Sequence, residues 1–218
     1  MTITAIIFDM DGVLCDSEPF ICEAAMRMFE QTYGVIVRRE DFVPFVGTGE
    51  DRFIGGVAEK YDVPLVMPRD KEQVYKIYLD IIRGRLHPLP GAVDFVAACR
   101  SRGLKTALAT SADAVKMRGN LHEIGIPASD FDAVITGDDV QRKKPDPQIF
   151  LLAAERLNIP PQHCLVIEDA PAGIRAAKAA GAFALGITSS FNAETLLQCG
   201  ADDVAQDLAH VPPDLLGT

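Results

Sequence analysis

Carboxylate, hydroxyl and ammonium side chains recur in this 218-residue sequence at the points where short apolar runs end. Crowded carboxylates repel one another and raise each other's pKa unless a cation lies among them. Oxygen ligands favour a hard cation such as Mg²⁺, which readily shares its coordination sphere with a phosphate group. The pattern therefore predicts a magnesium-dependent site for phosphoryl transfer. The residues concerned are Asp9, Asp11, Thr110, Ser111, Lys144, Glu168 and Asp169.

Within this set the four acids are expected to hold the metal. A hydroxyl group and an ammonium group supply the hydrogen bond and the charge that a phosphoryl group requires. Thr110, Ser111 and Lys144 are therefore expected to bind the phosphate.

The pair Asp9 and Asp11 predicts catalysis through a covalent intermediate. Residues two apart in an extended segment face the same side, so the two carboxylates are expected to converge while Met10 points away. Asp9 is then the expected nucleophile, forming an aspartyl-phosphate, and Asp11 the proton donor and acceptor. Each motif alone could instead be a turn or a helix cap. Their coincidence after successive apolar runs favours the catalytic interpretation.

The glycine-containing segment at residues 47–49 does not predict dinucleotide binding. In Gly47-Thr48-Gly49, Arg52 stands where the third glycine of G-x-G-x-x-G would be, and no strand precedes the motif. The segment has another expected role. We expect the chain of residues 17–86 to close over the site, and this motion would bring the segment next to the substrate. Gly47, Thr48, Glu50 and Arg52 are therefore candidates for substrate specificity.

The elements that must position these residues follow from the apolar pattern. The runs are short and apolar, as is typical of strands buried on both faces of a parallel sheet. Helical patterns separate the later runs, for example Val93, Val96 and Ala97 before Gly103. The alternation predicts an α/β fold with a doubly wound parallel sheet. The runs are residues 5–8, 104–109, 133–135, 165–167 and 182–187.

The alternation of strand and helix patterns stops in residues 17–86. Three stripes of apolar residues at helical spacing follow one another there, with no convincing strand between them. The Gly55-Gly56 pair weakens the second stripe, at a cost of roughly 1 kcal/mol per glycine. A helical bundle inserted after the first strand would cover the carboxyl edge of the sheet, where open α/β folds bind ligands. Two domains are therefore expected, a core of residues 1–16 and 87–218 and a helical cap of residues 17–86.

Composition limits the partners and the compartment. The formal charge of -10 disfavours binding to nucleic acid or to anionic membranes. Five scattered cysteines without a C-x-x-C pair are expected to be reduced thiols, and no signal peptide or membrane-spanning run is found. We expect a cytoplasmic monomer that acts on a small phosphorylated metabolite. The four histidines are isolated and are assigned no catalytic role.

The motifs together resemble the haloacid dehalogenase superfamily. The chain is most similar to its group of beta-phosphoglucomutases and phosphoglycolate phosphatases, which carry a helical cap after the first strand. The resemblance implies that Asp9 is the nucleophile and Asp11 the general acid and base. It also implies that Mg²⁺ is held by Asp9, the backbone carbonyl of Asp11 and Asp169. The motifs lie at residues 8–18, 108–111, 144–147 and 166–173.

Two departures from the mutase pattern favour hydrolysis. Ile21 stands where the mutases have a histidine, and Glu50 stands where they have an arginine that grips a second phosphate. A mutase nevertheless remains the alternative enzyme. More remote alternatives are a phosphoaspartate signalling receiver, which has no use for a helical insert, and a protein that has lost catalysis. Against the latter, all six residues with implied roles are present: Asp9, Asp11, Thr110, Lys144, Glu168 and Asp169.

Overall fold

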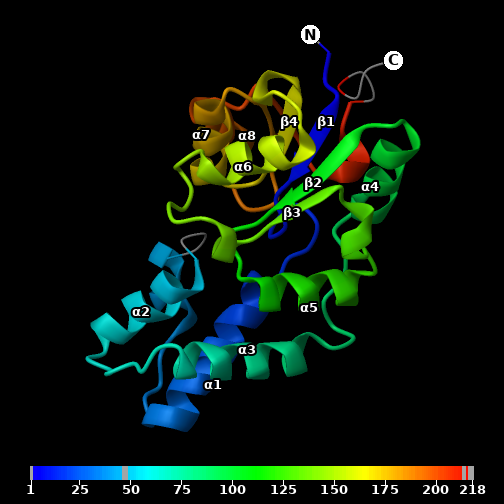
Figure 1. The fold of residues 1–218 in the computed structure, drawn as a ribbon. Coiled ribbons are helices and arrows are strands. Elements are labelled where there is room, and N and C mark those ends of the chain that lie inside the picture. The colour runs from blue at the N-terminus through cyan, green and yellow to red at the C-terminus, as the bar shows by residue number, and fades with distance from the viewer. Residues whose placement is uncertain (1, 46–48, 213–214, 216–218) are drawn as a thin grey trace.

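The computed structural model describes residues 2–45, 49–212 and 215, and its centre is a six-stranded parallel sheet (Figure 1). The strand order is β3-β2-β1-β4-β5-β6, so β1 lies between β2 and β4. Phe8, the last residue of β1, pairs in register with Leu108 of β2 and with Ile167 of β4. The carboxyl ends of these three strands therefore lie side by side. The strands are β1 (Ala5–Phe8), β2 (Lys105–Ala109), β3 (Ala133–Ile135), β4 (Cys164–Glu168), β5 (Phe183–Ile187) and β6 (Asp203–Ala205).

All five predicted strands are present, and β6 is an additional one. β6 is a three-residue strand at the sheet edge, and only Ala205 of its residues is buried. Because the strand is short and carries Asp203, it leaves no apolar run in the sequence. Pairing with β5 along Leu185, Gly186 and Ile187 makes it a strand.

Helices cover both faces of the sheet, which confirms the doubly wound fold. Ile6 and Phe8 point to the face that α4 covers, whereas Ala5 and Ile7 point to the face that α6 and α7 cover. Figure 1 shows α6, α7 and α8 together on one side of the sheet and α4 on the other. These helices are α4 (Ala92–Ser101), α5 (Ala114–Ile124), α6 (Gln148–Leu157), α7 (Pro171–Ala180) and α8 (Ala193–Gln198). Short 3₁₀ helices are η1 (Arg39–Asp41), η2 (Val43–Phe45), η3 (Ala128–Asp130), η4 (Gly137–Asp139), η5 (Pro161–His163) and η6 (Leu208–His210).

The buried face of α4 differs from the predicted one. Phe95, Val96 and Cys99 are buried, while Val93 and Ala97 are exposed. The predicted stripe is therefore right at Val96 and wrong at Val93 and Ala97, because Phe95 has more apolar surface to bury than these smaller side chains.

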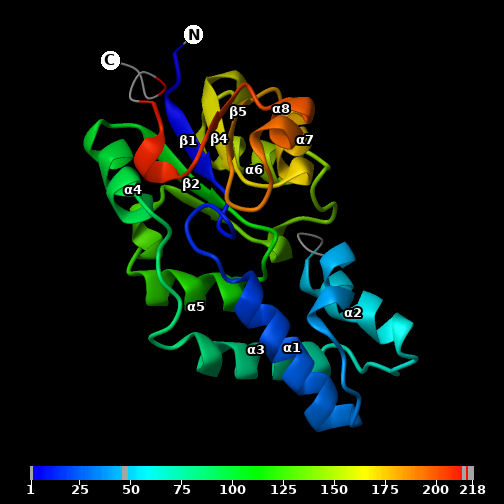
Figure 2. The same ribbon diagram turned by 180° about the vertical axis from the view of Figure 1, so that it is seen from behind.

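The expected three helices of the insert are α1 (Glu18–Tyr33), α2 (Glu50–Lys60) and α3 (Arg69–Ile82). Figure 2 shows them on the side of the sheet that carries the carboxyl ends of the strands, with α5 between the sheet and α3. Packing explains the glycine at position 56, because a Cβ there would lie 2.3 Å from the ring of Phe45. The glycine that weakened the prediction of α2 is thus what lets that helix approach Phe45.

The two chain segments that join the insert to the sheet lie side by side. Cys15 forms an isolated bridge with Pro88, and the Leu89 N–H donates to the carbonyl of Leu14 at 2.9 Å. The insert also contacts α5, and Lys71 pairs at 2.9 Å with Asp113, the residue that immediately precedes this helix. The division into a core and a cap at residues 16/17 and 86/87 stays a prediction.

All five cysteines lie in the described part of the chain and are free, and four of them are buried. Among the described residues, no helix has both the length and the apolar character needed to span a bilayer.

Candidate active site

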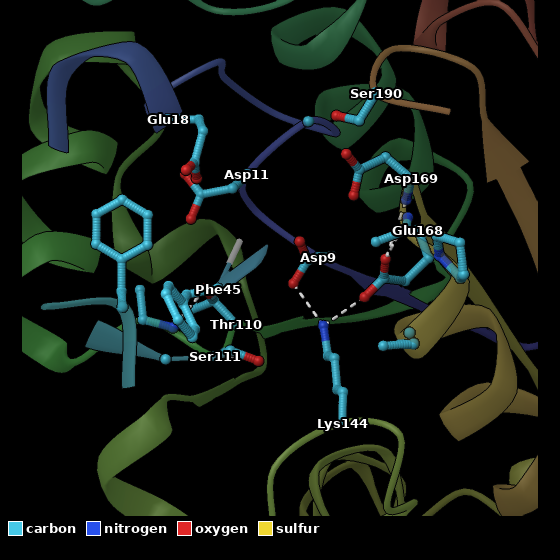
Figure 3. A pocket seen from close by; sticks show the side chains of 18 of the residues that line it. Asp9, Asp11, Glu18, Phe45, Thr110, Ser111, Lys144, Glu168, Asp169 and Ser190 are labelled. Atoms are coloured by element: carbon cyan, nitrogen blue, oxygen red, sulfur yellow. Dashed lines mark hydrogen bonds and ion pairs between the residues drawn. The ribbon is translucent and has the colours of Figure 1, made fainter. Parts of the chain in front are cut away.

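A cavity of about 340 Å³ lies between the carboxyl edge of the sheet and the helical insert. Its walls combine residues that follow β1, β2 and β4 with residues of α1, η2 and α2. Figure 3 shows that Asp9, Lys144, Glu168 and Asp169 form one group, while Asp11 and Glu18 form another. The polar lining consists of Asp9, Asp11, Asp16, Glu18, Glu50, Thr110, Ser111, Lys116, Lys144, Glu168, Asp169, Arg175 and Ser190.

Lys144 links two acids at the base of this cavity. Its Nζ donates to Asp9 Oδ1 at 2.7 Å and to Glu168 Oε1 at 2.5 Å, and its side chain is only 5% exposed. Glu168 is fixed further because its Oε2 accepts from the N–H groups of Asp169 and Ala170, each at 3.0 Å. An ammonium group in this position neutralises part of the acidic charge and can also contact a bound anion.

Asp9, Glu168 and Asp169 form a cluster that fits a metal ion. One oxygen from each lies within 4.8 Å of the others, and all three residues are buried. Burial raises the pKa of Asp9 to about 7, with Lys144 opposing the shift and Glu168 adding to it. Burial also raises the pKa of Asp169 well above its usual range, and the charges of Glu168 and Asp9 contribute. An all-oxygen set whose charges oppose ionisation suits a hard cation such as Mg²⁺.

Asp11 lies apart from this cluster. Its Oδ2 accepts from Lys116 Nζ at 2.7 Å, and its Oδ1 accepts from the Ser17 hydroxyl. Both aspartates line the same cavity while Met10 is fully buried, as strand alternation predicts, but the two carboxylates have different partners. The strand ends at Phe8, and the chain turns at Gly12 with φ at 77°. Of the four predicted metal-binding acids, the structure brings together three.

The predicted phosphate-binding residues line the same cavity. Thr110 follows β2 and is 1% exposed, and its hydroxyl oxygen accepts from the Ala112 N–H at 3.1 Å. Ser111 lines the cavity beside it and is half-buried. The Thr110 N–H donates to the carbonyl of Ile135 at 3.0 Å, which ties this loop to β3. Thr110, Ser111 and Lys144 therefore lie around the space next to Asp9.

The candidate specificity residues separate into three groups. Gly47 and Thr48 lie outside the described residues. Glu50 is 7% exposed and lines the cavity. Arg52 is absent from the described lining, since it pairs with Glu59 at 2.8 Å and its guanidinium lies 4.9 Å from the centre of the Phe45 ring. Successive helical residues are about 100° apart, so positions 50 and 52 of α2 face nearly opposite directions.

Lys116 is the main site residue that the sequence interpretation missed. It lies on α5, is 4% exposed, and contacts Asp11 together with Glu50, whose carboxylate is 3.5 Å away. Met117 and Leu121 on the same helix are buried, but a lysine beside such an apolar face is ordinarily solvated, so the sequence offers little sign of its role. Only the position of α5 beneath the insert buries it.

Glu18, at the start of α1, was part of the first motif but was not singled out. Burial raises its pKa to about 7, with Lys116 opposing and Asp11 adding to the shift. Arg175 and Ser190 are also additions to the predicted set, and both are exposed. No histidine is among the described lining residues.

Comparisons with known proteins agree with this geometry. The family described as "Hydrolase: haloacid dehalogenase-like hydrolase" matches residues 3–181. "Protein SUPPRESSOR OF QUENCHING 1, chloroplastic" of Arabidopsis thaliana is 40% identical over 212 residues, which cover 96% of this chain and 20% of that protein. The chain thus spans about a fifth of the length of that relative.

Two further relatives match along nearly their whole length. "Phosphorylated carbohydrates phosphatase" of Thermotoga maritima is 34% identical over 199 residues, covering 90% of this chain and 91% of that protein. The crystal structure of CbbY from Rhodobacter sphaeroides in complex with phosphate superposes with a TM-score of 0.83 at 26% identity, covering 95% and 96% of the two chains. The resemblance that the motifs indicated is confirmed: the chain belongs to the haloacid dehalogenase-like hydrolases and is a phosphoric monoester hydrolase.

Proposed function

We propose that the protein is a Mg²⁺-dependent phosphatase that hydrolyses a small phosphorylated carbohydrate through an aspartyl-phosphate at Asp9. The observation that carries the proposal is the position of the Asp9 carboxylate, held by Lys144 beside Glu168 and Asp169 and open to the cavity. The Thermotoga maritima relative is named for the same substrate class.

Asp9, Glu168 and Asp169 would hold the metal, together with the Asp11 carbonyl that the family resemblance implies. When bound, Mg²⁺ neutralises phosphate charge and orients the phosphoryl group. Thr110 and Ser111 donate hydrogen bonds to the phosphate oxygens, and Lys144 supplies a positive charge. Together these contacts fix the phosphorus next to the Asp9 oxygen and so lower the entropic part of the barrier.

In the first step, an Asp9 oxygen attacks the phosphorus while the bond from phosphorus to the leaving oxygen breaks. The carboxyl proton of Asp11 passes to that oxygen, and the alcohol departs. In the second step, Asp11 removes a proton from water, and the water oxygen attacks the phosphorus. The bond to Asp9 breaks, which releases inorganic phosphate and regenerates both aspartates.

The cavity lining supports hydrolysis over the mutase alternative. A mutase must bind a bisphosphate intermediate, so it needs a second phosphate-binding site near the insert. Ile21 and Glu50 line the insert side of this cavity, and Lys116 is already paired with Asp11 and Glu50. A carboxylate at that position repels a second phosphate.

An assay that follows both products tests this choice. With Mg²⁺ and beta-glucose 1-phosphate, we expect inorganic phosphate release and no glucose 6-phosphate formation that increases on adding a glucose bisphosphate primer. Glucose 6-phosphate and other hexose phosphates should also release phosphate. Primer-dependent isomerisation faster than phosphate release would overturn the phosphatase assignment in favour of the mutase.

Gly173→Ala should lower the activity although Gly173 itself takes no part in the reaction. A Cβ at Gly173 would lie 1.9 Å from the Glu168 carboxyl group, so that group must leave the position in which it pairs with Lys144. A displacement of about 1 Å in a catalytic arrangement can cost on the order of 100-fold in rate, and we expect a loss of that size in kcat/KM. Steady-state phosphate release would measure it.

Gly55→Ala is the matched control, because a Cβ there has no heavy atom within 4 Å and the residue does not line the cavity among the described residues. This variant should retain parental kcat/KM. Parental activity in a folded Gly173→Ala protein would show that the position of Glu168 does not matter to the reaction.

A further inference from the structure

The carboxyl group of Asp11 stands outside the group of side chains that Lys144 holds together (Figure 3). In the proposed function, on which this inference rests, Asp11 gives a proton to the leaving oxygen and later takes one from water. Such a transfer requires the carboxyl group to lie within hydrogen-bond reach of that oxygen. Asp11 follows β1 in a turn, and 28% of its side chain is exposed, so the sheet does not fix the position of its carboxyl group.

Two side chains hold the two oxygens of Asp11. Lys116 Nζ donates to Oδ2 at 2.7 Å, and the fully buried Ser17 hydroxyl donates to Oδ1. A carboxyl group that accepts at both oxygens loses a hydrogen bond when it rotates or changes rotamer. Each oxygen keeps a second lone-pair position, which can carry the proton to be transferred.

Lys116 is itself held between the core and the insert. It lies on α5 and is 4% exposed, and its ammonium group lies 3.5 Å from Oε1 of Glu50 on α2. Acids on both sides of an ammonium group favour its charged form. A solvated lysine has a flexible side chain, whereas this one is confined by burial and by two partners. Lys116 is therefore a rigid support for the carboxyl group of Asp11.

Stability alone explains this ion pair poorly. A buried ion pair often stabilises a fold no more than apolar residues of the same volume do. Met117 and Leu121 are buried on the same helix, so α5 already has apolar side chains that pack. Lys116 also lines the cavity together with Asp11, which places the pair at the reacting groups.

We propose that Lys116 is a positioning residue for Asp11: its ammonium group holds the Asp11 carboxyl group within reach of the leaving oxygen, and Glu50 of the insert holds the ammonium group in turn. Lys116 acts on the reaction through Asp11. Its role differs from that of Lys144, which is paired with Asp9 and Glu168.

Lys116→Met keeps the apolar part of the side chain but removes the ammonium group. We expect it to slow glucose release from glucose 6-phosphate in a single turnover by about 100-fold, the cost of a misplaced acid group. p-Nitrophenyl phosphate has a leaving oxygen that departs without a proton, so release of p-nitrophenol should slow by less than about threefold. A generally damaged site would slow both reactions.

A double variant tests whether Lys116 acts through Asp11. Asp11→Asn alone should slow glucose release by roughly 100-fold or more, because it removes proton transfer. Adding Lys116→Met to Asp11→Asn should change the rate by less than about threefold, since residues that act as a unit are not additive. The double variant removes both charges of the pair, so it decides the question even if Lys116→Met alone does not fold.

Lys105→Met is the matched control. Lys105 is ion-paired with Asp132 at 2.7 Å and does not line the cavity among the described residues. This variant should cleave both esters at the parental rate.

Equal slowing of both esters in folded Lys116→Met would overturn the proposal, as would no slowing of either. A further loss of about tenfold or more on adding Lys116→Met to Asp11→Asn would also overturn it, and would assign Lys116 to the substrate itself.

Failure of the phosphatase function would look different, since the parent would then cleave neither ester. Crystal structures of the parent and of Lys116→Met test the proposal independently of turnover. The Asp11 carboxyl group should leave its parental position in the variant or occupy more than one position. An Asp11 carboxyl group in the parental position would overturn the proposal.

Discussion

Asp9→Asn is expected to lower phosphate release by at least about 10⁴-fold, the scale of loss seen when a covalent nucleophile is removed. A neutral amide is a poor nucleophile towards phosphorus, and the substitution also removes the ion pair with Lys144. Phosphate release under single-turnover conditions, together with mass spectrometry for a phosphorylated Asp9, would measure the effect. The parent should carry the phosphoryl group transiently, and the variant should not.

The same substitution should not unfold the protein. Because burial and Glu168 raise the pKa of Asp9 to about 7, the ionised carboxylate opposes folding above that pH in the absence of metal. Thermal unfolding of metal-free Asp9→Asn at pH 8 should therefore occur at or above the parental temperature.

Asp94→Asn, at an exposed position on α4, serves as the control and should match the parent in both assays. Near-parental turnover by folded Asp9→Asn would exclude a covalent aspartyl-phosphate.

Removal of divalent metal is expected to lower activity by at least about 1000-fold, because a bound cation contributes several kcal/mol to stabilising transition-state charge. Mg²⁺ should restore the activity. Ca²⁺ should restore much less, since its longer and looser coordination misplaces the phosphoryl group. Phosphate release after chelation and after titration with each ion would measure this.

Mg²⁺ should also stabilise the protein in a pH-dependent way. The folded pKa values of Asp9 and Asp169 lie above the usual range, so the metal-free fold binds extra protons and loses stability as pH rises towards about 7. Mg²⁺ binds the ionised carboxylates and should raise the unfolding temperature more at pH 8 than at pH 5. Full activity after exhaustive chelation, or no stabilisation by Mg²⁺ at either pH, would contradict a metal at Asp9, Glu168 and Asp169.

Much of the scaffold could be predicted because burial leaves periodic marks in the sequence. Strands covered on both faces are short apolar runs, and all five predicted runs are strands. The helices of the insert could be predicted for the same reason, since Met28, Phe29 and Tyr78 are fully buried members of the three helical stripes. β6 was missed and the buried face of α4 was misplaced. An edge strand and a helix with few large apolar residues both give a weak apolar pattern in the sequence.

The sequence by itself determined which residues meet at the carboxyl edge of the sheet. Asp9, Thr110 and Glu168 each stand at or just past a predicted strand end, and the carboxyl ends of parallel strands meet at one edge of a sheet. That β1 lies between β2 and β4, which makes the three residues neighbours, is a property of the tertiary structure. Only the tertiary structure decided the rest of the cavity. The carboxylate of Asp11 is held by Lys116 and Ser17 instead of joining Asp9, Glu168 and Asp169. Lys116 and Glu50 meet across the gap between α5 and α2, a contact over a long sequence separation that depends on how two helices pack and that no local pattern encodes.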